Sequence, residues 1–299
     1  MLRRSIQAMI VMLVLMAVSV SAQDGLALMK VEVGARPTGM GGAFVSILDG
    51  PNSSPYNPAA AARTSKFTVS LSHLAYWSNI RIETGYFATN LTGRSWLHGG
   101  IRYAADDNLE HRGITASSEP DYMFNLHDVS FKAGFAYQVT DQLIAGVAFG
   151  WFAEKIDIYQ GSTFNADLGL LYEVNSDVNV GASVANLGSD FTISSVDGVE
   201  SAKIALPVTY RVGGSYTYNR YLGAADIVVL DDEFHLHLGA EAWLHEYFAL
   251  RSGYMANYDT KSFTAGASFV QRNFTVEYAF VPYSGALGTS HLFNLTVSL

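Results

Sequence analysis

Two histidines and a glutamate in one short stretch of the chain could bind a metal ion. His235, His237 and Glu241 lie on one face if residues 234–244 form a strand, because side chains alternate between the two faces of a strand. Two histidines two residues apart can bind one metal ion, but no third ligand is evident. A polar strand face without a metal accounts for the same residues, so we expect no metal and no other cofactor.

Charged side chains occupy the same kind of face in other candidate strands. Six of them lie on the more polar face by this alternation: Arg102, Lys132, Asp167, Arg211, Arg251 and Glu277. We expect them to form ion pairs and hydrogen bonds rather than to catalyse a reaction. The sequence has no Gly-x-Ser-x-Gly elbow, no phosphate-binding loop and no outstanding group of serine, histidine and acid. The protein is therefore expected not to be an enzyme.

The elements that carry these residues are predicted to be strands with two unlike faces. From Lys66 onward, apolar residues alternate with small or polar ones, as in VSFKAGFAYQV, where Phe131 and Phe135 share one face and Ser130 and Lys132 the other. Fourteen such segments are predicted, near 66–77, 80–91, 95–104, 127–139, 142–154, 162–174, 178–187, 207–218, 221–230, 234–244, 247–255, 261–270, 273–281 and 290–299.

The connections between these segments alternate between two length classes. TGRS, TDQ, NSD, NR and QRN are tight turns, whereas the intervening connections are mostly longer: AADDNLEHRGITASSEPDYMFNL, KIDIYQGS, GSDFTISSVDGVESAKIAL, ANYDTKS and PYSGALGTS. Bacterial outer-membrane barrels have short periplasmic turns, longer extracellular loops and an even strand number. The sequence therefore predicts an all-β fold, a transmembrane antiparallel barrel of about 14 strands, in the outer membrane with both termini in the periplasm.

Composition agrees with a protein whose partner is outer-membrane lipid. Charged residues make up 15% of the chain and aromatic residues 13%, while a soluble domain has roughly 25% charged residues. The formal net charge of −9 argues against nucleic acid as a partner. After the first two dozen positions no apolar run is long enough for a spanning helix, which needs about 18 residues.

The first 22 residues are predicted to be a secretory signal peptide. Arg3 and Arg4 precede an apolar stretch from Ala8 to Val20, and Ala22 precedes the predicted cleavage site. The alternative is a membrane anchor, which is disfavoured because a spanning helix needs roughly 20 apolar residues.

Residues 23–63 are predicted to form a plug, or hatch, inside a barrel of residues 64–299. Glycines permit close packing and prolines interrupt regular structure in this stretch. The residues that define the plug motif are Gly39, Gly41, Gly42, Asp49, Asn57, Pro58 and Ala59. The alternative is a disordered periplasmic tail, but Phe44, Val45 and Ile47 make the stretch more apolar than a solvated tail usually is.

Aromatic residues are predicted to form belts at the two membrane interfaces. Beside the short turns lie Trp96, Tyr137, Tyr172, Tyr218, Tyr221, Tyr247 and Phe274. Toward the longer loops lie Tyr76, Trp77, Tyr103, Trp151, Tyr254, Tyr258, Phe280 and Tyr283.

The last strand, HLFNLTVSL, resembles the closing-strand signal that the outer-membrane barrel assembly machinery reads during insertion. Phe293, Leu295, Val297 and Leu299 share one face, although such signals usually end in an aromatic residue. The alternative is an ordinary terminal strand.

The stretch GARPTGMGGAFVSILDGPNSSPYNPAAAA resembles the N-terminal signature of the PorV/PorQ family, which is similar to the fatty-acid transporter FadL and shares an Asn-Pro-Ala element with it. That element is Asn57, Pro58 and Ala59 here. The likeness continues through DLGLLYEV, LPVTYRVGGSY and FHLHLGAEAWL, although the chain lacks the longer external insertions of the secretion members.

The resemblance implies a fourteen-stranded barrel with an internal plug, and it leaves two functions open. The PorV/PorQ branch implies an accessory role in type IX protein secretion, with secretion-system proteins and the C-terminal domains of cargo as partners. The FadL branch implies uptake of hydrophobic small molecules through a lateral gap in the wall. We favour the secretion role from the sequence, with the transport role as the alternative.

Overall fold

A computed structural model of the chain describes residues 26–299 apart from 65–66, 77–79, 115–116, 196 and 286, and only the backbone of residues 200–202. The signal peptide predicted for residues 1–22 lies outside this part. Among the described residues, no helix has the length and apolar character needed to cross a membrane.

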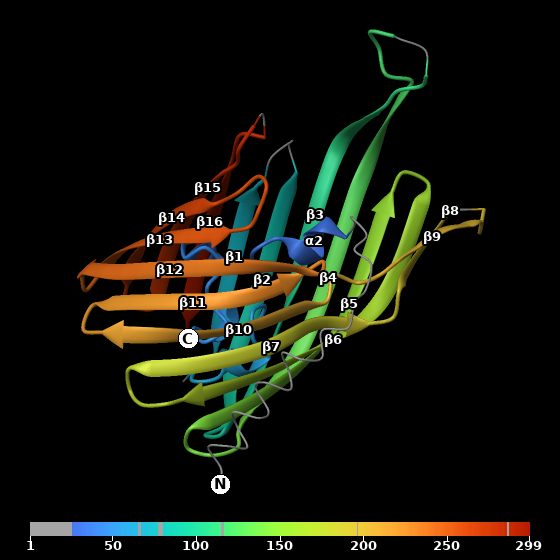
Figure 1. Cartoon of the computed structure of the whole chain (residues 1–299). Helices are drawn as coiled ribbons and strands as arrows, with labels where there is room; N and C mark the ends of the chain where they lie inside the picture. The colour runs from blue at the N-terminus through green and yellow to red at the C-terminus, as the bar shows by residue number, and fades with distance from the viewer. Residues whose placement is uncertain (1–25, 65–66, 77–79, 115–116, 196, 286) are drawn as a thin grey trace.

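Fourteen antiparallel strands form a closed barrel, as the sequence predicted (Figure 1). The barrel strands are β1 (Thr68–Ala75), β2 (Arg81–Thr92), β3 (Ser95–His111), β4 (Tyr122–Gln138), β5 (Leu143–Ile156), β6 (Tyr159–Glu173), β7 (Val178–Gly188), β10 (Thr209–Tyr218), β11 (Tyr221–Leu230), β12 (Glu233–His245), β13 (Phe248–Ala256), β14 (Phe263–Gln271), β15 (Phe274–Pro282) and β16 (Thr289–Ser298). Each pairs with its neighbour along the chain, and β16 pairs with β1 to close the ring. Each of the fourteen predicted segments overlaps one of these strands.

Two further strands lie within a stretch that the sequence predicted to be a loop. β8 (Phe191–Ser195) and β9 (Glu200–Ile204) form a hairpin, and Tyr159 and Gln160 at the start of β6 pair with the end of β8. Phe191 is fully buried, because it packs edge-to-face on Phe152 of β5. The hairpin therefore belongs to one end of the barrel.

The connections alternate in length less strictly than predicted. The prediction of a longer loop at KIDIYQGS is wrong, because β5 and β6 extend to a two-residue turn at Asp157 and Ile158. A second two-residue turn, Asp231 and Asp232, joins β11 and β12 on the same side. Asp157, Asp231 and Asp232 have φ values of 51°, 52° and 62°, and aspartate tolerates this left-handed region, which tight hairpins require.

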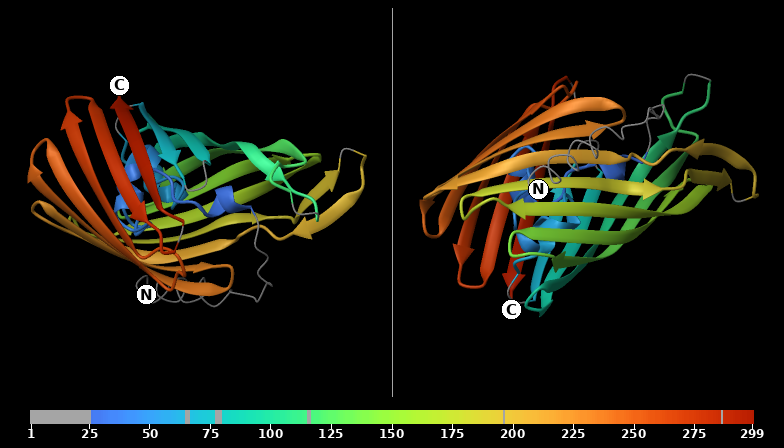
Figure 2. Two further views of the ribbon diagram at one scale, coloured as in Figure 1. Left: turned by 90° about the horizontal axis from the view of Figure 1, so that it is seen from above. Right: turned by 60° about the horizontal axis from the view of Figure 1, so that its bottom comes forward.

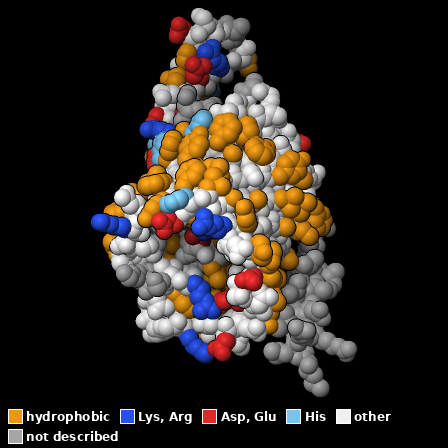
Figure 3. Space-filling model, turned by 90° about the vertical axis from the view of Figure 1, so that its left-hand side faces the viewer, with side chains coloured by type: hydrophobic (Ala, Val, Ile, Leu, Met, Phe, Trp, Pro, Cys, Tyr) orange, Lys and Arg blue, Asp and Glu red, His pale blue; other side chains and the backbone are white. Residues whose placement is uncertain are grey.

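The two faces of the wall differ in polarity. Outward-facing side chains include exposed Phe131, Phe149, Phe269 and Phe293. Figure 3 shows how apolar side chains gather on one side of the molecule. Inward-facing side chains on the same strands are mostly polar or small and buried, as the burial patterns show.

The predicted aromatic belts are present only in part. Tyr137, Tyr218, Tyr221, Tyr247 and Phe274 are exposed beside the short turns, and Tyr103, Trp151 and Tyr254 are exposed toward the other end. Trp96 is an exception, because its side chain is buried and its Nε1 donates a 3.0 Å hydrogen bond to the carbonyl of Thr64. Tyr258 stacks on His235, which faces inward, and Trp77 lies outside the described residues.

Residues 26–63, the N-terminal segment, lie within the ring of strands (Figure 2). The segment contains four short helices, α2 (Ala27–Lys30), α3 (Ala35–Gly39), η1 (Gly50–Asn52) and η2 (Pro58–Ala61). α3 contacts β13 to β16, η1 contacts β1 and β2, and η2 contacts β4 to β6. The segment therefore touches strands around the whole ring.

Candidate functional site

Glycines of the N-terminal segment lie against the inner wall with no room for a side chain. A Cβ atom on Gly39 would lie 3.1 Å from the Cα of Gly266, and one on Gly41 would lie 2.9 Å from the amide nitrogen of Tyr254. A Cβ on Gly42 would lie 2.8 Å from Nδ1 of His237. Gly41 and Gly42 also have φ values of 63° and 72°, so glycine is favoured there for two reasons.

Asn57 forms hydrogen bonds that hold the second half of the segment against the barrel wall. Its side-chain amide donates to the carbonyls of Val45 at 2.8 Å and Leu170 of β6 at 3.0 Å, and its Oδ1 accepts from the amide of Ala59. Pro58 begins η2 directly after this cap. Asn57 thus joins two turns of the segment to one strand of the barrel.

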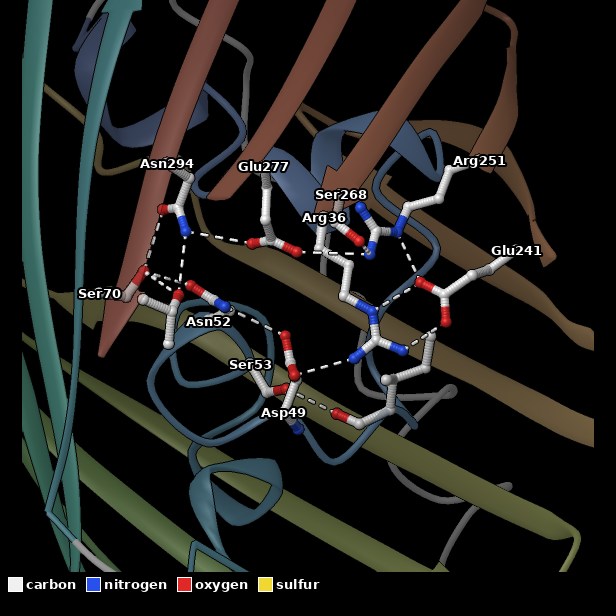
Figure 4. A network of polar contacts seen from close by, with 12 residues as sticks. Arg36, Asp49, Asn52, Ser53, Ser70, Glu241, Arg251, Ser268, Glu277 and Asn294 are labelled. Carbon is white, nitrogen blue, oxygen red and sulfur yellow. Dashed lines mark hydrogen bonds and ion pairs between the residues drawn. The ribbon is translucent and has the colours of Figure 1, made fainter. Parts of the chain in front are cut away.

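A buried polar network joins the first half of the segment to the opposite wall (Figure 4). The Arg36 guanidinium donates two 2.8 Å hydrogen bonds to the Glu241 carboxylate of β12 and forms a 2.8 Å ion pair with Asp49. Glu241 also accepts a 2.5 Å hydrogen bond from Arg251 of β13, which in turn lies 3.3 Å from Glu277 of β15. Two arginines and three carboxyl groups are thus joined in one network inside the barrel.

Amide and hydroxyl groups extend the network to the seam of the barrel. Asn294 of β16 donates to Glu277 at 3.1 Å, and the Ser70 hydroxyl of β1 lies 2.9 Å from Oδ1 of Asn294 and 2.6 Å from Oδ1 of Asn52, one of which accepts its proton. Asn52 donates back to Asp49. The network therefore runs from the N-terminal segment across the closing strand pair and returns to the segment.

Charges in the network hold Arg36 in its protonated form. Burial alone lowers the pKa of the guanidinium, but Asp49 and Glu241 outweigh it and the pKa is raised above its ordinary value. For Glu32, burial raises the pKa of the carboxyl, while the charge and the 2.6 Å hydrogen bond of Lys261 outweigh burial and lower it. Both groups of the segment are therefore charged at neutral pH.

The two histidines lie beside an aromatic ring rather than around a metal site. The His235 ring stacks on Tyr258 with centroids 3.9 Å apart, and His237 Nε2 lies 2.9 Å from the Tyr258 hydroxyl. Glu241 is bound to Arg36 and Arg251 instead. Within the described residues, no three His, Cys, Asp or Glu side chains are grouped as a metal site requires.

Two arginines of the predicted inward set contact the N-terminal segment. Arg102 of β3 donates a 2.9 Å hydrogen bond to the carbonyl of Val31. The Arg211 guanidinium of β10 lies over the Tyr56 ring, 5.4 Å from its centroid. The Tyr56 hydroxyl in turn bonds to both backbone groups of Val33.

Lys132 and Asp167 lie at a β-bulge in the wall. The pairing of β6 and β7 shifts between Ala166 and Leu168. There Asp167 accepts a 2.8 Å hydrogen bond from the amide of Asn186 and forms a 2.5 Å ion pair with Lys132. The Asn186 side chain accepts from Lys132 at 3.0 Å and donates to the carbonyl of Pro207.

Asn186 was absent from the residues singled out in the sequence. Its φ of 63° lies in the left-handed region, which asparagine visits more readily than most residues. The one available signal was an asparagine followed closely by a glycine near the end of a predicted strand, in the stretch ANLG.

An apolar cluster occupies the end of the barrel opposite the short turns. It joins α2, the β8 hairpin and inward residues of the wall: Leu26, Leu28, Ala35, Leu74, Ile82, Ala104, Phe152, Phe191, Ile193, Leu206, Ala279 and Leu292. The sequence pointed to a polar interior and did not indicate this cluster, because its members come from distant segments.

The closing strand carries the predicted pattern on its outward face. Phe293, Leu295 and Leu299 are exposed, Val297 is half-buried, and Asn294 points into the network described above. The role of these residues in barrel assembly stays a prediction.

Solved structures share this fold at low sequence identity. The chain is similar to the CymD monoaromatic hydrocarbon channel, with 13% identity, a TM-score of 0.65 and coverage of 90% of this chain and 98% of that one. It is similar to the Pseudomonas putida toluene transporter TodX, with 14% identity, a TM-score of 0.64 and coverage of 94% and 99%. A Pseudomonas aeruginosa FadL homologue matches with 10% identity, a TM-score of 0.56 and coverage of 88% and 97%.

No family model and no curated protein matches the sequence. The PorV/PorQ assignment, the role in type IX secretion and the partners that it implied therefore stay predictions. The chain has the barrel fold of hydrocarbon channels and of a FadL homologue.

Proposed function

We propose that the protein is an outer-membrane channel for uptake of small hydrophobic molecules and that the N-terminal segment is its plug. The observation that carries this proposal is the apolar cluster at the loop end of the barrel. A water-filled pore has a polar interior, whereas Phe152, Phe191 and Leu206 pack into a buried apolar cluster at this end. An apolar solute gains free energy by leaving water for contact with such side chains.

The outward side chains support a membrane location. Exposed phenylalanine and leucine side chains around the barrel are unfavourable in water and favourable in lipid. A closed barrel also has no free strand edge, so its backbone hydrogen bonds are satisfied within the membrane. The first residue of β1 and the last of β16 pair at the short-turn end of the barrel. By the usual orientation of such barrels, both termini then face the periplasm.

The plug role follows from what the N-terminal segment fills. Fully buried Met40, Phe44 and Ala59 occupy the ring, and the Arg36 network joins the segment to five strands of the wall, β12, β13, β15, β16 and β1. Water and ions then have no straight path through the barrel. A solute that enters the apolar cluster needs another exit, and the register shift between β6 and β7 beside Asn186 is a candidate for a lateral one.

The test is uptake by intact cells, because the lipopolysaccharide leaflet of an outer membrane slows apolar solutes more than a simple lipid bilayer does. Cells with the protein are expected to take up labelled toluene faster than cells without it. The Phe191→Asp variant, which places a charge in the apolar cluster, is expected to lose most of this difference. Equal uptake with and without the protein would remove the transport function.

A further inference from the structure

An apolar groove lies on the outside of the wall, away from the N-terminal segment and the apolar cluster. It spans β10 to β13 beside the short turns and has a volume of about 620 Å³. This volume falls within the roughly 300–1,000 Å³ of small-molecule sites. Apolar atoms make up most of its lining.

Small residues form the floor of the groove and aromatic rings form its rim. Gly223 and Ala240 are paired across β11 and β12, and Ala240 is paired with Ser252 of β13. Tyr216 and Tyr221 flank this floor on the β10 and β11 side, and both rings are exposed. The groove is therefore a depression between outward side chains.

A basic residue lies in the short turn that joins two lining tyrosines of the groove. Arg220 belongs to the two-residue turn between Tyr218 and Tyr221, and both tyrosines line the groove. The arginine is exposed, and among the described residues its side chain has no hydrogen-bond or ion-pair partner. Arg94 in another short turn has such a partner, since it lies 3.0 Å from Asp141.

We propose that this groove binds one phospholipid of the surrounding membrane, with an acyl chain over Gly223 and Ala240 and the headgroup phosphate on Arg220. An apolar groove on the outward face matches an acyl chain, and an unpaired guanidinium at the level of the turns matches a phosphate. Tyrosine rings between the two suit the boundary between lipid and water. The proposal depends on the membrane location and not on the transported solute.

Native mass spectrometry of the full mature protein in mild detergent tests this site. The protein is incubated with phosphatidylglycerol or with diacylglycerol of the same chains, which lacks the phosphate. Arg220→Gln is expected to lower the bound fraction of phosphatidylglycerol about fivefold, the factor for roughly one basic residue at an anionic lipid surface. It is expected to leave binding of diacylglycerol unchanged.

Two further variants separate this site from general lipid binding. Arg272→Gln changes an exposed arginine in the turn between β14 and β15, whose neighbours in the chain do not line the groove, and it is expected to bind phosphatidylglycerol as the wild type does. The double variant Gly223→Leu with Ala240→Leu fills the floor and is expected to lose the lipid even though Arg220 is present.

Equal lipid retention in Arg220→Gln and Arg272→Gln would overturn the proposal. If the wild type is a dimer and the double variant Gly223→Leu with Ala240→Leu is a monomer, the groove binds a second copy of the chain. That result would also overturn the lipid proposal. Recovery of the wild type as a water-soluble species without detergent would remove the membrane location, whereas failed toluene uptake would leave the lipid site intact.

Discussion

Arg36 and Glu241 lie 205 residues apart in the chain, and their side chains form two hydrogen bonds of 2.8 Å inside the barrel. Glu241 is almost completely buried, so loss of Arg36 removes two hydrogen bonds from a carboxylate that then has Arg251 as its remaining ion-pair partner. This pair holds the N-terminal segment to β12, so the position of the segment depends on the closed barrel around it.

Replacement of Arg36 by glutamine is expected to destabilise the protein by about 3 kcal/mol, because Asp49 and Glu241 both lose an ion-pair partner inside the barrel. The free energy of unfolding in guanidinium chloride, measured in detergent micelles, checks this value. Arg63→Gln is the matched control because the pair of Arg63 with Glu173 is much more exposed, and its loss is expected to cost at most about 1 kcal/mol. Equal losses in the two variants would show that the Arg36 network does not anchor the segment.

Replacement of Gly146 by alanine is expected to disturb the contact between β5 and the N-terminal segment. The new Cβ would run into the backbone of Pro58 and Ala59, and such overpacking costs roughly 1–3 kcal/mol. A lower unfolding midpoint and faster proteolysis of the segment are the expected results.

Gly214→Ala provides the control for that prediction. Gly214 also lies in a barrel strand, but the nearest atom to a new Cβ is the Asn179 carbonyl oxygen at 3.4 Å. This variant is expected to keep wild-type stability. If both alanines have the same effect, the segment does not press against β5 as described.

The ion pair of Glu32 and Lys261 predicts a defined dependence on pH. Because the folded pKa of Glu32 lies below its ordinary value of 4.5, the carboxylate stabilises the fold above about that pH. The stabilisation is lost as the pH falls through the folded pKa. Glu32→Gln is expected to be less stable than the wild type at pH 7 by roughly 1–3 kcal/mol, with a difference that shrinks below pH 4.5. A difference that grows on acidification would refute this sign.

The bulge at Asn186 predicts different effects of two substitutions. Both Asn186→Gly and Asn186→Ala lose the hydrogen bonds to Lys132 and Pro207. Alanine must also adopt a φ of 63°, which costs roughly 1–2 kcal/mol for a residue with a Cβ. Thermal unfolding is therefore expected to rank the wild type first, glycine second and alanine last, and the opposite order of glycine and alanine would contradict the left-handed geometry.

The sequence predicted the barrel well because strand alternation is a local signal. A residue such as Phe131 and its neighbour Lys132 reveal two faces without knowledge of any partner strand. The turn at Asp157 escaped prediction because KIDIYQGS mixes apolar and polar residues in a way that fits both a loop and two extended strand ends.

The interior was harder to predict than the wall. Alternation placed Glu241 and Arg251 on one face of neighbouring strands, but the sequence does not show that Arg36 reaches them across 205 residues. Phe191 and Leu28 belong to the same apolar cluster although they lie far apart in the sequence, so no local pattern joins them. Trp96 was predicted to lie in an aromatic belt because tryptophan is common at membrane interfaces. Its side chain instead points into the barrel, where the indole nitrogen donates a hydrogen bond to the carbonyl of Thr64.

The central claim is that apolar solutes pass this barrel while the N-terminal segment keeps water and ions out. Toluene uptake by intact cells, measured together with the ion current of the purified protein in planar bilayers, tests it most directly. The account predicts faster toluene uptake with the protein present, little ion current through the wild type, and a large current once residues 26–63 are deleted. Large currents through the wild type, or uptake that does not depend on the protein, would contradict it.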